Sequence, residues 1–150
     1  MNLRETIDSK LKIAMKEGND DQKRVFRLIL ASAKLAEVEN RSPLDDTGLM
    51  SIIQKEVKIR REALEGAQAA HRDDLIAKNL KEISILEDLL PRQLSDDDLT
   101  ALVSQIIRET GASGPADTRK IMKALMPKVQ GRAAGDRVSL IVRQALQNLT

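Results

Sequence analysis

Apolar residues recur every three or four positions along most of this 150-residue chain, which is the spacing of amphipathic helices and not of strands. Four helices are predicted in the first 90 residues, each opened by a capping residue or an acidic first turn. Their predicted limits are Asn2 to Gly18, residues 19–21 to Asn40, residues 45–47 to about Ala70, and Asp73 or Asp74 to Leu90.

The apolar faces of these helices indicate which residues form a core. The second helix has a broad apolar surface that includes Phe26, the single aromatic residue, and this breadth predicts a central position. On the fourth helix, one face is expected to point inward as a group: Leu75, Ile76, Leu80, Ile83, Leu86 and Leu90.

A boundary is predicted where Pro91 prevents the fourth helix from continuing. Ser95 and Asp98 have the spacing of a capping box, and Leu94 and Leu99 that of a hydrophobic staple, so a new helix is expected to start here. The chain is therefore divided into an N-terminal helical subdomain, residues 1–94, and a C-terminal subdomain, residues 95–150.

The C-terminal subdomain is predicted to hold three helices. The first carries a regular apolar stripe and stops at Gly111, and the second begins near Asp117 and is ended or kinked by Pro127. The stretch from Pro127 to Gly135 is expected to be a turn, with Gly131 and Gly135 available for positive φ. The last helix has its own apolar face: Val138, Ile141, Val142, Ala145, Leu146 and Leu149. The expected fold class is all-α.

The inventory of reactive residues is small. Without cysteine, thiolate nucleophiles and cysteine-based metal sites are excluded, and His71 is the single histidine. Neither a dinucleotide-binding nor a phosphate-loop glycine motif occurs. We therefore expect no catalytic residue, no metal and no cofactor. No signal peptide or membrane span is recognised, and a cytoplasmic location is expected.

Charge is distributed unevenly in the C-terminal part. Residues 95–118 hold one basic and five acidic residues, net −4, whereas residues 119–150 hold seven basic residues against Asp136, net +6. Lys and Arg clustered at a helix end and turn can bind phosphates. The candidate RNA-binding residues are Arg119, Lys120, Lys123, Lys128, Arg132, Arg137 and Arg143. A solvated surface is the alternative, and charge alone does not decide between the two.

The near-absence of aromatic residues narrows the kind of nucleic acid. With Phe26 expected in the core, no aromatic side chain is left on which an unpaired base could stack. Recognition of the phosphate backbone and of shape remains possible. A folded RNA is therefore a better match to this chain than a single strand read base by base.

Two stretches resemble the YqeY-like family: residues 82–95, EISILEDLLPRQLS, and residues 120–135, KIMKALMPKVQGRAAG. The similarity extends over essentially the whole chain and includes residues 60–63, RREA. The C-terminal part of that family is similar to the tail domain of the GatB subunit of the tRNA-dependent amidotransferase. In that enzyme the tail contacts tRNA away from the reacting groups.

The resemblance implies an all-helical protein with a three-helix tail-like part, and a carbon–nitrogen ligase association with glutamine as amide donor. It does not imply the amidotransferase active sites, which belong to other domains and subunits. The match is weaker at three positions: Arg119 replaces a usual Gly, Leu89 a usual Tyr, and residues 134–136, AGD, a commoner DGK. Lys120, Lys123, Lys128 and Arg132 match best.

The leading expectation is thus a non-catalytic module that binds tRNA or another structured RNA and assists amidotransfer, with a protein of tRNA aminoacylation as a further partner. One alternative is a protein-interaction or assembly module without an RNA role. Another is a glutamine-dependent ligase component, although the residues suggest no stand-alone activity. The sequence leaves the oligomeric state open.

Overall fold

The computed structural model describes residues 2–149, which form seven α-helices, one short 3₁₀ turn and no strand. The predicted all-α class is confirmed. The chain divides into two compact units, which we call unit 1, up to Pro91, and unit 2, from Arg92 onward. None of the described helices is both long and apolar enough to cross a bilayer.

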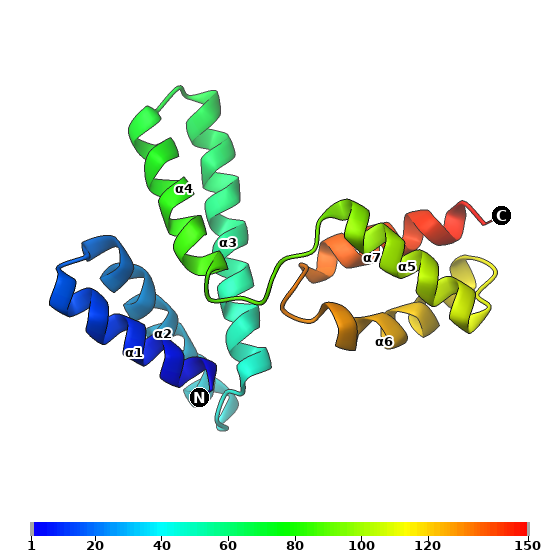
Figure 1. Cartoon of the computed structure of the whole chain (residues 1–150), viewed down its shortest axis with the longest axis horizontal. Coiled ribbons are helices and arrows are strands. Elements are labelled where there is room, and N and C mark those ends of the chain that lie inside the picture. The colour runs from blue at the N-terminus through cyan, green and yellow to red at the C-terminus, as the bar shows by residue number, and fades with distance from the viewer. Residues whose placement is uncertain (1, 150) are drawn as a thin grey trace. The chain divides into compact units, whose positions relative to one another are not determined.

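Unit 1 consists of two helix hairpins (Figure 1). Helices α1 (Leu3–Glu17) and α2 (Asp20–Asn40) form the first, and α3 (Asp46–Ala69) and α4 (Asp73–Glu87) form the second. The predicted capping residue of α1, Asn2, forms a capping box with Glu5: the Asn2 side chain accepts from the backbone N–H of Glu5, and the Glu5 carboxylate accepts from the backbone N–H of Asn2. Gly18 ends α1 with φ 67°, a left-handed conformation that glycine adopts without strain.

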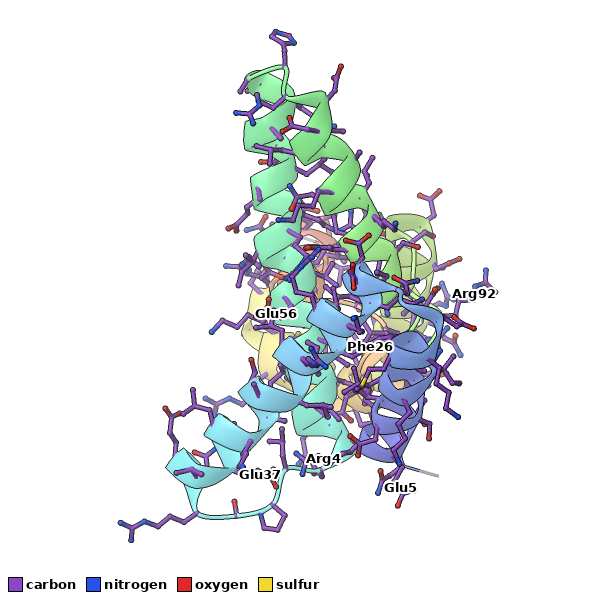
Figure 2. The ribbon with its side chains drawn as sticks, turned by 90° about the vertical axis from the view of Figure 1, so that its left-hand side faces the viewer. Arg4, Glu5, Phe26, Glu37, Glu56 and Arg92 are labelled. Carbon is purple, nitrogen blue, oxygen red and sulfur yellow. The ribbon has the colours of Figure 1, made fainter. Side chains whose placement is uncertain are left out.

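The core of unit 1 gathers apolar residues from all four helices, and Phe26 is within it at 3% exposure (Figure 2). The inward prediction for α4 was wrong at Leu75 and Leu80, which are 37% and 51% exposed. The buried residues of α4 all lie in its second half, from Glu82 onward. The reason is geometric: the outer half of the α3–α4 hairpin extends past α1 and α2 (Figure 1), so it lacks a second layer.

Helix α4 ends at Glu87, earlier than the predicted Leu90. The amides of Leu89 and Leu90 donate to carbonyls three residues back, those of Leu86 and Glu87, so the chain tightens before it leaves the helix. A residue that precedes proline is disfavoured in α conformation, and here that residue is Leu90. Pro91 therefore acts on the residues before it as well as on its own position.

A buried charge network connects three helices of unit 1. Glu82 on α4 is 6% exposed and accepts hydrogen bonds from Arg24 of α2 at 3.1 Å and from Arg60 of α3 at 3.0 Å. Arg60 also donates to the Glu56 carboxylate at 2.6 Å. Next to this network, Asp21 of α2 accepts hydrogen bonds from Lys81 and Arg24. Both bonds lower the pKa of Asp21, and the bond from Lys81 has the larger effect. Glu82 is thus a buried carboxylate with both of its oxygens bonded to guanidinium groups.

Unit 2 is a three-helix assembly of α5 (Asp96–Thr110), α6 (Thr118–Val129) and α7 (Gly135–Gln147), with a 3₁₀ turn at Pro115–Asp117 before α6. Ser95 and Asp98 form the predicted capping box, and Gly111 ends α5 with φ 70°. The fully buried side chains come from all three helices: Leu99, Val103, Ile121, Leu125, Val129, Val138, Val142 and Leu146.

Four details of unit 2 differ from the prediction. Pro127 does not end the helix, because α6 continues to Val129. Proline lacks an N–H and its ring crowds the carbonyl four residues earlier, but Pro127 is exposed and lies in the last turn of α6. The turn is therefore shorter than predicted, residues 130–134. Gly131 has the expected positive φ of 74°, whereas Gly135 is the first residue of α7 and does not. Leu149 follows α7 and is 48% exposed.

Candidate nucleic-acid interface

Helix α6 carries exposed cations. Arg119, Lys123 and Lys128 are all exposed, and none of them has an ion-pair partner within residues 2–149. Ile121 and Leu125 are fully buried in the core of unit 2, on the side of the helix that faces away from Arg119 and Lys123. Lys128 lies about 140° around the axis from Lys123 and is exposed near the end of α6. We call Arg119, Lys123 and Lys128 the α6 cations.

Lys120 lies beside the α6 cations but has a structural contact. Its Nζ donates to the carbonyl of Thr110 at 2.9 Å, in the last turn of α5. A cation at this end of a helix interacts favourably with the helix dipole. The backbone N–H of Ser113 lowers the pKa of the neighbouring Asp117, and the charge of Lys120 adds to that effect. Lys120 therefore helps to connect α5 to the start of α6.

Arg132 and Arg137 hold the segment before α5 against the turn after α6. Arg132 Nε donates to the Arg92 carbonyl at 3.1 Å, and its own carbonyl accepts from Leu94 N–H at 2.8 Å. Arg137 donates to the Leu94 carbonyl, and its Nε lies 2.8 Å from the Asp96 carboxylate. That Nε is buried and is matched by charge instead of by a well-aligned hydrogen bond. We call these contacts the arginine clasp.

The clasp gives Arg137 a role that needs no RNA. We expect Arg137→Ala to lower the unfolding free energy of unit 2 by about 1–2 kcal/mol. The half-buried Leu94 carbonyl loses its hydrogen-bond donor, and the Asp96 carboxylate loses its ion-pair partner. Urea unfolding followed by circular dichroism measures this loss. The conservative Arg137→Lys should recover part of it. An unchanged stability in Arg137→Ala would show that the clasp contributes nothing.

An open depression of about 390 Å³ lies next to the clasp. Two arginines line it, Arg92 and Arg132, together with Asp98, Gln105 and the apolar residues Leu94, Ala101 and Leu102. The side chain of Arg132 has one hydrogen bond within residues 2–149, and that bond uses Nε. Arg132 is thus anchored where it lines the depression, and a fixed guanidinium suits a phosphate.

Sequence reasoning missed Arg92 and Gln105 as candidates. Both precede the basic stretch of residues 119–150, and Arg92 lies in the segment predicted as a boundary. The fold brings Arg92 to Arg132 across forty residues of sequence. The distribution of charge along the sequence does not predict this long-range contact. Arg92 does lie within residues 82–95, one of the two stretches that resemble the YqeY-like family.

Arg143 is placed apart from the clasp, on the exposed side of α7. Its Nε donates to the Ser139 carbonyl at 3.4 Å, one turn earlier on the same helix, and within residues 2–149 it forms no hydrogen bond or ion pair with another element. The seven predicted residues thus fall into three groups: the α6 cations, the residues with structural bonds (Lys120, Arg132 and Arg137), and Arg143 alone on α7.

The described residues contain no group of three His, Cys, Asp or Glu side chains arranged to hold a metal ion. His71 is exposed at the turn between α3 and α4, with φ 54°. Paired acids lie in the first turns of α2 and α4, where they complement the helix dipole.

The fold and the surface charge together define the class of this protein: a small helical protein with a basic three-helix unit. The family model described as Yqey-like protein matches residues 4–146, so the chain belongs to the YqeY-like family. It is 37% identical over 78 residues to Altered inheritance of mitochondria protein 41, mitochondrial, of Eremothecium gossypii, a match that covers 51% of this chain and 43% of that protein. The chain is also 27% identical over 95 residues to an uncharacterized protein of Schizosaccharomyces pombe, and this match covers 63% of this chain and 77% of that protein.

Proposed function

We propose that this protein is a non-catalytic module that binds tRNA or another folded RNA through unit 2. The observation that supports the proposal is the set of α6 cations, which are all exposed and lack acidic partners within residues 2–149. Unpaired exposed cations are free to exchange small counterions for phosphates, and the release of those ions favours binding. Arg132 and Arg92 at the nearby depression add two more guanidinium groups.

The proposed RNA is folded, since the single aromatic side chain, Phe26, is buried in unit 1. Surface residues of unit 2 provide charge and hydrogen-bond donors, which suit phosphates held at fixed spacing by a folded backbone. We further propose a role beside glutamine-dependent amidotransfer, which is what the similarity of the C-terminal part of this family to the GatB tail implies. In that role the protein would position tRNA, and the ligase chemistry would belong to its protein partner.

The test is fluorescence anisotropy with labelled, folded tRNA and the full chain. If about four phosphates are contacted, we expect affinity to fall about 100-fold between 50 and 200 mM salt. A duplex DNA of similar charge serves as the comparison for shape. Absence of binding at 50 mM salt would refute the proposal and favour a protein-interaction module, whose apolar contacts depend little on salt.

A further inference from the structure

Helix α2 of unit 1 presents an apolar stripe to solvent. Leu28, Leu35 and Val38 are 38%, 59% and 68% exposed, and Ala31 between them is exposed as well. Leu35 and Val38 have the highest exposures of any large apolar side chains within residues 2–149. At 100° per residue, the stripe lies roughly 140° around α2 from the buried Ile29. We call these four residues the α2 stripe.

The spacing of the α2 stripe is that of a helix-pairing seam. Positions 28, 31, 35 and 38 alternate by three and four residues, which corresponds to two heptads with apolar residues at both inner positions. The core of unit 1 already uses the opposite face of α2, through Val25, Phe26, Ile29 and Ala33. An amphipathic surface helix normally has polar residues at such outer positions, so the stripe calls for a separate explanation.

The flanking charges of the stripe are self-complementary in one orientation. Lys34 borders it on one side and Glu39 on the other, and both are exposed without an ion-pair partner within residues 2–149. In a parallel helix pair, these heptad positions place Lys34 next to Glu39 of the second copy, twice by symmetry. An antiparallel pair would instead place Lys34 beside its own counterpart and Arg27 near Arg41 of the other copy.

We propose that the α2 stripe is the contact by which two copies of this chain associate, with their α2 helices parallel. Two heptads bury a small area, so the dimer is weak, with a dissociation constant on the order of 100 µM. Such a dimer would double the number of basic units in one particle. The proposal does not depend on RNA binding, because the stripe belongs to unit 1 and the α6 cations to unit 2.

Sedimentation equilibrium of the full chain between about 10 and 500 µM tests the proposal. We expect a monomer–dimer equilibrium whose dissociation constant rises at least about tenfold in Leu35→Glu, which buries a charge in the seam. Leu80→Glu is the matched control, since Leu80 is an exposed leucine on α4, at 51%, outside the stripe. A chain that stays monomeric at 500 µM, or a dimer unaffected by Leu35→Glu, would overturn the proposal.

A charge exchange tests the parallel orientation. Lys34→Glu should weaken the dimer about fivefold, because two attractive pairs become repulsive, and Lys34→Glu combined with Glu39→Lys should restore it. Circular dichroism verifies that each variant stays helical. A double variant no better than Lys34→Glu would contradict the parallel pairing.

Discussion

Reversing the three α6 cations together, as Arg119→Glu, Lys123→Glu and Lys128→Glu, is expected to weaken binding of folded tRNA at least about 100-fold at 50 mM salt. These side chains are exposed and have no ion-pair partner within residues 2–149, so the substitution removes phosphate contacts without breaking an intramolecular one. The slope of log affinity against log salt should decrease by about 3, since about three counterions fewer are released.

A matched triple variant separates position from net charge. Lys10→Glu, Lys12→Glu and Lys16→Glu change the charge by the same amount on exposed positions of α1 in unit 1. We expect this variant to lose only a few-fold in affinity, through the long-range field alone. Equal losses in both variants would show that total charge, and not the α6 surface, governs binding. Anisotropy titrations at two salt concentrations measure both effects.

The largest expected effect on stability comes from Glu82→Gln. Glu82 receives donors from both Arg24 and Arg60, and the Arg60 side chain is only 12% exposed. An amide at this position loses the negative charge and turns an N–H₂ group toward a guanidinium. We expect the unfolding free energy of unit 1 to fall by about 2–3 kcal/mol, a value reduced because the Arg24 side chain is 49% exposed. Urea unfolding measures the change.

Two further variants make the Glu82 result specific. Glu65→Gln, at an exposed position on α3, should change stability by less than about 0.5 kcal/mol. Arg60→Met combined with Glu82→Leu should be more stable than the sum of the single losses predicts, because removing both charges leaves neither buried alone. Strict additivity of the two substitutions would show that Arg60 and Glu82 do not depend on each other.

The sequence was sufficient to predict what local chemistry determines. The capping boxes at Asn2 and Ser95 and the stops at Gly18 and Gly111 are where the side chains and glycines predicted them. Each depends on residues within one turn of the helix end, so a single sequence contains the whole signal.

Errors arose where the outcome depends on distant residues. The period of α4 marks Leu75 and Leu80 as inward, but burial also requires a neighbouring helix, which the outer half of the hairpin lacks. Pro127 remains inside α6 because the buried Leu125 and Val129 hold both sides of it in the core. Helical period identifies a face, and only the packing of other elements determines whether that face is covered.

The candidate site shows the same division. The exposure of Arg119 and Lys123 could be predicted from helical period and charge alone, because a cation opposite a buried helix face lies toward solvent. The bonds of Lys120, Arg132 and Arg137 to backbone carbonyls could not, since their acceptors lie ten to forty-three residues away in sequence. The same long-range contacts bring Arg92 to the depression beside Arg132.

The most direct test of an RNA-binding unit 2 is an NMR titration of the ¹⁵N-labelled full chain with unlabelled, folded tRNA at 50 mM salt. We expect the amide signals of α6 and of residues 130–134 to shift or broaden first, those of α1 to α4 to change little, and 200 mM salt to reverse the changes. Perturbations centred on unit 1, or a spectrum unchanged at 50 mM salt, would contradict this expectation.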